Sequence, residues 1–214
     1  MTHTLKTIPY SHYETNLPQE GAVILGQCQG EDLIVYQAFN KHIATYAVAK
    51  QQFGGAAYSF NRMTWIKPNF LWMMYRAGWA TKANQEHILA IRMRMGGLIA
   101  LLEAGVYSSY QARLYGSEAN WKAALATSDV RIQWDPDHGP GGNKLTRRAI
   151  QIGIRGKTLH TFNSEWIVGI EDVTSFVVAQ RPYLSGQLDQ LQVIEESVIS
   201  VPPTIKEKYE IIAG

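Results

Sequence analysis

The feature that most constrains this chain is the stretch Ser59–Trp79, which is punctuated by Pro68 and Gly78. A residue that precedes a proline is pushed out of the α region, so we expect Lys67 to be extended. Pro68 suits the first turn of a helix, because the amide that it lacks would have no partner there. Gly78 suits a left-handed cap at a helix end. Pro68 and Gly78 therefore predict an extended segment that is followed by a short helix, Pro68–Ala77.

Basic and hydroxyl side chains are concentrated just before this predicted helix. Arg62, Thr64 and Lys67 precede its first residue closely in the sequence. The first amides of a helix are unpaired and lie at the positive end of its dipole, so an anion is expected at this corner. The spacing i, i+4 also places Trp72 and Arg76 on one face of the helix.

Two interpretations of the aromatic residues in this stretch stay open. Bases interleaved with aromatics are typical of surfaces that stack on nucleobases and bind phosphates. Alternatively, Trp65, Trp72 and Trp79 are core residues, and the arginines stack on them from outside.

The net charge of +2 conceals a separation of charge along the sequence. Residues 33–157 contain 16 Lys and Arg against 6 Asp and Glu, whereas both flanking segments are acidic. No acid occurs between Leu33 and Gln85, a segment that we call the acid-free window. Its six bases are Lys41, Lys50, Arg62, Lys67, Arg76 and Lys82. Such a segment is either neutralised by the rest of the fold or presents a basic face to an anionic partner.

Length and composition predict one domain in a reducing compartment. A chain of 214 residues can bury one substantial core. No run approaches the roughly 20 apolar residues of a membrane span, and the N-terminus lacks the apolar core of a secretory signal. The single cysteine, Cys28, cannot form an internal disulfide. We therefore expect a cytoplasmic protein without a membrane partner, with a loosely ordered lead-in (residues 1–20) before one domain (residues 21–214).

Strand and helix patterns are mixed without a regular βαβ rhythm. Alternating apolar residues predict strands at 33–39, 87–95 and 150–154, and helical spacing predicts a helix at 42–52. Residues 118–126 also look helical, and a cap at Asp172 or Thr174 with a stop at Pro182 predicts a helix that ends at about Arg181. The glycines and prolines of residues 135–143 predict a loop. We therefore predict an α+β fold, in which helices pack on a mixed or antiparallel sheet.

Polar residues inside apolar patterns provide further candidates for a site. Gln37 would lie among apolar neighbours and need a partner, which could be an amide, a base edge or a loop. Glu171 follows the predicted strand 166–170, where a carboxylate could stabilise a cation or take a proton, or could simply be solvated.

The segment Gln133–His138 combines two carboxylates with an imidazole. Its spacing matches no established metal site and turn chemistry explains Asp-Pro-Asp, so we predict no metal here. Asp135 could instead act as a positioned acid or a hydrogen-bond acceptor. Arg147, Arg148 and Gln151 form a second basic cluster near the glycine-rich loop.

Six blocks of the sequence resemble a family of bacterial and fungal proteins known as a domain of unknown function. The blocks are Val35–Ala38, Arg62–Pro68, Trp72–Arg76, Gln133–Pro136, Gln151–Gly153 and Ile170–Thr174. The similarity extends from about Gly21 to Arg181 and implies no established activity. The family tends to follow its Gln-Trp-Asp-Pro block with an acid and then an arginine, whereas this chain has Asp137 and His138.

The layout is also similar, more distantly, to that of the ADP-ribosyltransferases. This resemblance implies NAD as cofactor and a nucleotide or polynucleotide ligand on the basic aromatic face. It implies Glu171, Arg62 and Gln37 as catalytic residues, with Glu171 steadying a cationic ribose. Under the resemblance Gln37 and Arg62 would contact NAD, and Thr64 and Trp65 would line the nicotinamide site. With the residues of the anion corner, the predicted cofactor-binding set is Tyr36, Thr64, Trp65, Lys67, Trp72 and Arg76. We further predict that Gln133, Asp135, Arg148 and Gln151 contact or support the acceptor.

Three functions remain open at this point. The first is a nucleotide-dependent transferase acting on an anionic acceptor, such as a nucleic acid. The second is a non-catalytic domain that binds RNA or single-stranded DNA, and the third is a phosphate-ester hydrolase using Asp135 and Arg62. A transferase of the first kind requires Glu171 to face Arg62 and Lys67, whereas a pure binder would gain from losing that carboxylate.

Overall fold

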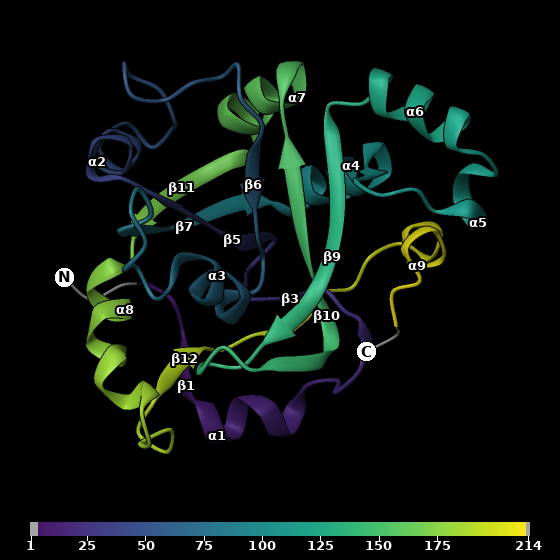
Figure 1. The fold of residues 1–214 in the computed structure, drawn as a ribbon. Helices are drawn as coiled ribbons and strands as arrows, with labels where there is room; N and C mark the ends of the chain where they lie inside the picture. Colours follow the sequence, from purple (N-terminus) through teal and green to yellow (C-terminus); the bar gives the residue numbers. More distant parts are fainter. Residues whose placement is uncertain (1–3, 213–214) are drawn as a thin grey trace.

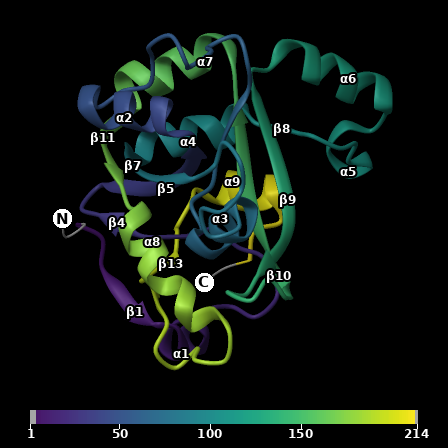
Figure 2. The ribbon, with the colours of Figure 1, turned by 60° about the vertical axis from the view of Figure 1, so that its left-hand side comes forward.

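The computed structural model describes residues 4–212 of the chain. Helices and strands are mixed, as predicted for an α+β fold (Figure 1). Two larger sheets make up most of the strand structure. Figures 1 and 2 both show helix α3 (Phe70–Ala77) lying between them.

The first sheet is antiparallel and has the order β11-β7-β5-β4. Its strands are β4 (Cys28–Gln29), β5 (Asp32–Phe39), β7 (His87–Arg94) and β11 (Ile167–Asp172). Successive residues of β5 face opposite sides, so Val35 belongs to one hydrophobic cluster and Tyr36 to the other. The alternation predicted for residues 33–39 is therefore confirmed, and the sheet is buried on both faces.

The second sheet is built on a long hairpin. Its strands are β2 (Gly21–Ala22), β6 (Thr64–Ile66), β8 (Val106–Tyr107), β9 (Val130–His138) and β10 (Lys144–Ile154). The loop predicted at 135–143 is shorter than expected, because β9 continues through Pro136 to His138. A buried ion pair between Arg147 Nε and Asp137 Oδ2, 2.6 Å long, ties the two strands together beyond the proline.

Shorter elements cover these sheets. The other helices are α1 (Tyr10–Tyr13), α2 (Lys41–Lys50), α4 (Met95–Ala104), α5 (Ala112–Tyr115), α6 (Glu118–Thr127), α7 (Gly156–Thr161), α8 (Thr174–Gln180) and α9 (Pro203–Tyr209). Two small antiparallel pairs join β1 (Thr7–Pro9) to β12 (Gln192–Ile194) and β3 (Leu25–Gly26) to β13 (Ser197–Val198). Within residues 4–212, no helix has the length and apolar character needed to cross a membrane.

Helix α3 ends as predicted but begins later. Gly78 adopts the left-handed conformation, with φ 56°, and caps the helix at its C-terminal end. At the other end the cap is Asn69, whose side chain accepts a hydrogen bond from the Trp72 amide at 2.6 Å. Because this side chain replaces a missing helical acceptor, the first helical residue is Phe70 and not Pro68.

The N-terminal segment, expected to be a loosely ordered lead-in, is packed from residue 4 onwards. Leu5, Tyr13 and Leu17 are buried in one of the two hydrophobic clusters. These apolar residues do not recur with the period of a helix or a strand, so the sequence does not reveal their burial. They are buried because segments from the other end of the chain, such as β12, cover them. Residues 1–3 of the expected lead-in and residues 213–214 of the expected domain lie outside the described residues.

Candidate functional site

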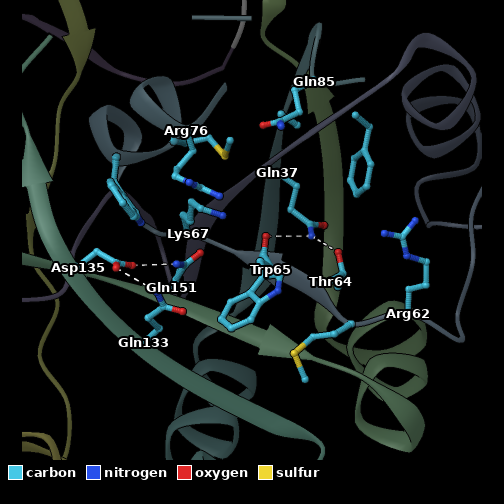
Figure 3. Close-up of a pocket in the computed structure, with 15 residues that line it drawn as sticks. Gln37, Arg62, Thr64, Trp65, Lys67, Arg76, Gln85, Gln133, Asp135 and Gln151 are labelled. Carbon is cyan, nitrogen blue, oxygen red and sulfur yellow. Dashed lines mark hydrogen bonds between the residues drawn. The ribbon is translucent and has the colours of Figure 1, made fainter. Parts of the chain in front are cut away.

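A cavity of about 590 Å³ lies beside α3, β5, β6 and the β9–β10 hairpin (Figure 3). Its volume is within the range of roughly 300–1,000 Å³ that is typical of ligand sites. Ten residues predicted from the sequence line it together: Gln37, Arg62, Thr64, Trp65, Lys67, Trp72, Arg76, Gln133, Asp135 and Gln151. The structure therefore brings four separate stretches of the sequence to one place.

Lys67 is the buried cation of this cavity, with 6% of its surface exposed. Its backbone is fixed by two hydrogen bonds with Tyr36, of 2.7 and 3.1 Å. Its ammonium forms no ion pair or hydrogen bond within residues 4–212. Burial and the nearby Arg76 lower the pKa of Lys67 to about 8, although Asp135 opposes the shift. A buried charge beside a like charge is costly, so this arrangement favours a bound anion.

Asp135 is the only carboxylate among the described residues that line the cavity. Two amides orient it: Gln133 Nε2 donates to Oδ1 at 3.0 Å, and Gln151 Nε2 donates to Oδ2 at 2.8 Å. The two glutamines are direct partners in the β9–β10 register, which is why both reach the same carboxylate. A carboxylate held in this way can stabilise a positive charge or accept a proton.

Gln37 lines the cavity and carries an unpaired acceptor. Its Nε2 donates to the Thr64 hydroxyl and, at 3.2 Å, to the Trp65 carbonyl oxygen. A carbonyl oxygen can only accept, so this contact fixes which end of the amide is the donor. Gln37 is only 3% exposed, and its Oε1 has no partner among the described residues. A buried acceptor of this kind is costly unless a ligand supplies a donor.

The two tryptophans of the cavity differ in how accessible they are. Trp72 is buried, its ring stacks on Tyr75 and His138, and the Arg76 guanidinium lies 6.0 Å from its ring centroid. The face predicted to be shared by Trp72 and Arg76 is therefore confirmed. Trp65 is half-buried and is the better platform for stacking on a ligand.

Gly153 makes room for the Trp65 ring. The two residues are partners in the antiparallel pair of β6 and β10. A Cβ atom at position 153 would lie 3.0 Å from the Trp65 ring and 2.6 Å from Met63 Sδ. The glycine therefore lets the indole lie against β10, at the wall of the cavity.

The position at the N-terminus of α3, where an anion was predicted, is occupied by the carboxyl group of Glu196. Glu196 Oε1 accepts a hydrogen bond from the Phe70 amide at 2.7 Å. Its Oε2 accepts from the Tyr13 hydroxyl at 2.6 Å and from Asn69 Nδ2 at 3.2 Å. Burial raises the pKa of Glu196 to about 8. The cavity consequently opens on the side of α3, and the helix amides are not available to a ligand there.

The family described as Domain of unknown function (DUF4291) matches residues 23–200. The chain belongs to the DUF4291 family. The matched region includes every residue that lines the cavity, whereas β1 and α9 lie outside it. No curated protein matches the chain.

The glutamate expected to complete the site lies elsewhere in the DUF4291 fold. Glu171 lines a different cavity, of about 210 Å³, and accepts a hydrogen bond from Thr4 Oγ1 at 2.8 Å. Glu171 is paired with Ala90, which is paired in turn with Tyr36. Residues opposite one another across a sheet share a face, so Glu171 points to the side opposite Gln37. Glu171 therefore does not face Arg62 and Lys67, and this prediction from the ADP-ribosyltransferase resemblance is wrong.

Two other predicted residues also lie outside the cavity. Tyr36 is fully buried and packs edge-on against Phe70, with ring centroids 5.6 Å apart, so it is a core residue and not a ligand contact. Arg148 donates to the Trp134 carbonyl oxygen at 2.7 Å and lines a separate cavity of about 300 Å³. Trp79 likewise belongs to the core, where its Nε1 donates to the Pro140 carbonyl oxygen at 3.1 Å.

Five residues that line the cavity were not predicted as site residues: Ala38, Phe39, Met63, Met73 and Gln85. Gln85 is the polar one among these five. Gln85 lines the cavity from the connection between α3 and β7. Its neighbours form a polar loop without any period, so no local signal identifies it.

Asp137 and His138, which follow the segment Gln133–Pro136, both have structural contacts. Asp137 is paired with Arg147, which also pairs with Glu14 at 2.9 Å. His138 stacks on Tyr75, with ring centroids 3.5 Å apart. In the described part of the chain, no group of three or more His, Cys, Asp or Glu side chains is placed to hold a metal ion.

The six bases of the acid-free window are not neutralised by the fold. None of them forms an ion pair within residues 4–212. Bases outside the window do form ion pairs: Arg92, Arg113, Lys122, Arg147 and Arg155. Arg62, Lys67 and Arg76 line the cavity, so this part of the basic excess faces the site.

Proposed function

We propose that the cavity binds a nucleotide and that the protein transfers a group from it, in the manner of an ADP-ribosyltransferase that uses NAD. The observation that carries the proposal is the buried, unpaired Lys67 ammonium beside Arg76. A phosphate group would supply the missing counter-charge, and a guanidinium matches two phosphate oxygens at once.

The neutral groups of the cavity suit the remainder of a nucleotide. The half-buried Trp65 offers a ring on which a base can stack. The unpaired Gln37 Oε1 can accept a hydrogen bond from a carboxamide, such as that of nicotinamide, or from the amino group of a base. Polar groups that are unpaired without a ligand also favour ligands that can pair with them.

Asp135 takes, in this proposal, the role that the resemblance assigned to Glu171. When the bond between ribose and nicotinamide breaks, its electron pair leaves with the nicotinamide and positive charge develops on the ribose. The Asp135 carboxylate stabilises that charge. As the acceptor oxygen forms the new bond to the ribose carbon, its proton passes to the same carboxylate.

Binding is tested by calorimetric titration of NAD and ADP into the wild type and a Lys67→Met variant. Methionine keeps the apolar stem and removes the charge. A charge-assisted hydrogen bond contributes about 1.5–3 kcal/mol, so we expect binding weakened roughly 10- to 150-fold. Lys157→Met changes an exposed lysine outside the cavity and should bind as the wild type does. Failure of the wild type to bind either nucleotide, or equal affinity in Lys67→Met, would refute the proposal.

Catalysis is tested by measuring NAD consumption in an Asp135→Asn variant. We expect a loss of about 100- to 10,000-fold in turnover, the usual effect of removing a catalytic acid or base, with affinity retained. Glu171→Gln is the control, because its carboxylate lies in another cavity, and it should consume NAD normally. If the wild type consumes no NAD but binds oligonucleotides, the protein is the non-catalytic RNA or single-stranded DNA binder instead.

A further inference from the structure

A second cavity, of about 570 Å³, adjoins the first. The two cavities share the lining residues Phe39, Arg62, Met63 and Thr64, so they meet along these side chains. Beyond them, the second cavity extends towards the start of α2 and the loop that contains Tyr58. Its volume alone lies within the range of roughly 300–1,000 Å³ that is typical of ligand sites.

The second cavity differs from the first in charge. Arg62 is the only charged side chain among the described residues that line it. Its other walls are neutral: the polar Asn40, Ser59 and Asn84, and the aromatic Phe39 and Tyr58. Such walls suit an uncharged ring that carries hydrogen-bonding groups.

Arg62 stands at the junction of the two cavities. Its guanidinium forms no ion pair or hydrogen bond within residues 4–212. Figure 3 shows Lys67 and Arg76 on one side of the first cavity and Arg62 on the other, with Gln37, Thr64 and Trp65 between them. Of the bases that line the two cavities, Lys67 and Arg76 therefore lie in the first cavity and Arg62 lies at the junction.

We propose that the ligand spans both cavities, with its phosphates between Lys67, Arg76 and Arg62 and an uncharged, nucleoside-sized ring system in the second cavity. The inference rests on the proposed function, because it assumes a nucleotide in the first cavity. It selects a dinucleotide, in which two nucleosides are joined through phosphates, over a mononucleotide. A mononucleotide would leave the walls around Tyr58 without a partner.

The matched pair Ala57→Trp and Ala56→Trp tests this inference. Both alanines are exposed neighbours on one loop, but only Ala57 lines the second cavity and neither lines the first. A tryptophan at position 57 would fill the second cavity. With nicotinamide in the first cavity, adenosine takes the second, so nicotinamide mononucleotide is the matched ligand that needs the first cavity alone. We expect the wild type to bind NAD roughly 5- to 100-fold more tightly than nicotinamide mononucleotide, the range expected for one further stacked base. Ala57→Trp should remove this preference and leave the affinity for nicotinamide mononucleotide unchanged, and Ala56→Trp should retain both.

Asn84→Gly is a second variant that keeps the backbone. Asn84 has φ 63°, which glycine adopts without strain, so only the side-chain amide in the second cavity is lost. It should weaken NAD binding and leave the binding of nicotinamide mononucleotide unchanged. Equal wild-type affinities for NAD and nicotinamide mononucleotide, or a preference that survives in Ala57→Trp, would overturn this inference and leave the proposed function standing. No binding of nicotinamide mononucleotide or of NAD would overturn both.

Discussion

Replacing Glu196 with glutamine should change how the stability of the protein depends on pH. In the wild type this carboxyl lies at the N-terminus of α3, 8% exposed. Burial raises its pKa to about 8, while hydrogen bonds from Tyr13 and Phe70 oppose the shift. Glutamine keeps the size of the side chain and an acceptor for the Phe70 amide, but it does not titrate.

The sign of the effect follows from proton linkage. The folded protein holds this proton more tightly than the unfolded chain, where the pKa is near the ordinary value of 4.5. The stabilisation from Glu196 is therefore complete below pH 4.5 and is lost as the pH rises to about 8. Each pH unit in this window removes up to about 1.4 kcal/mol, so the whole loss is on the order of 5 kcal/mol. Against this, the new NH₂ group faces the Asn69 amide, which costs about 1–3 kcal/mol at every pH.

Urea unfolding followed by tryptophan fluorescence, between about pH 5 and about pH 9, measures both effects. Glu196→Gln should be the less stable protein at the acidic end and the more stable one at the basic end, so the two curves cross. Glu195→Gln, an exposed neighbour, should follow the wild type throughout. Parallel curves for the wild type and Glu196→Gln would show that the carboxyl titrates normally, and the reasoning from burial would fail.

Two further predictions concern the first cavity. Nucleotide affinity should fall as the pH rises through about 8, because Lys67, whose pKa burial lowers to that value, loses its charge. In Lys67→Arg the fall should be absent, since arginine stays charged. Calorimetry on either side of that pH measures both affinities, and a wild-type affinity that does not change with pH would contradict the prediction. Gly153→Ala should destabilise the protein by about 1–3 kcal/mol and weaken nucleotide binding, because its Cβ meets Met63 Sδ at 2.6 Å. Gly96→Ala, whose Cβ has nothing within 4 Å, is the matched control in thermal unfolding and calorimetry, and equal losses in both variants would contradict the packing argument.

Local signals were sufficient to predict the end of α3 and the face that Trp72 and Arg76 share. A left-handed cap at Gly78 and an i, i+4 pair such as Trp72 and Arg76 depend on one or two turns of chain. Neither requires knowledge of what packs against the helix. The start of the helix was less certain, because Pro68 and Asn69 both suit it and only the hydrogen bond of Asn69 decides between them.

For residues whose neighbours are set by strand pairing, the sequence predicts the residue but not which other residues lie beside it. The alternation within β9 places Gln133 and Asp135 on one face, but it does not reveal that Gln151 of β10 lies opposite. Glu171 was misplaced for the same reason. Its position at a strand end was predicted, but the side of the sheet to which it points is set by the pairing of β11 with β7. In that pairing Glu171 lies opposite Ala90, which is 81 residues earlier in the chain.

The charge pattern leads to the cavity through side-chain cations and not through the dipole of α3. Glu210 and Glu14, from the flanking segments, pair with Arg113 and Arg147, which lie outside the acid-free window. The Glu196 carboxyl occupies the N-terminus of α3. None of them reaches Lys67, which remains buried and unpaired within residues 4–212. The anion site proposed for this protein consequently consists of side-chain cations, not of helix amides. Its affinity must then respond to removal of the Lys67 charge and to pH, whereas a site made of backbone amides would respond to neither.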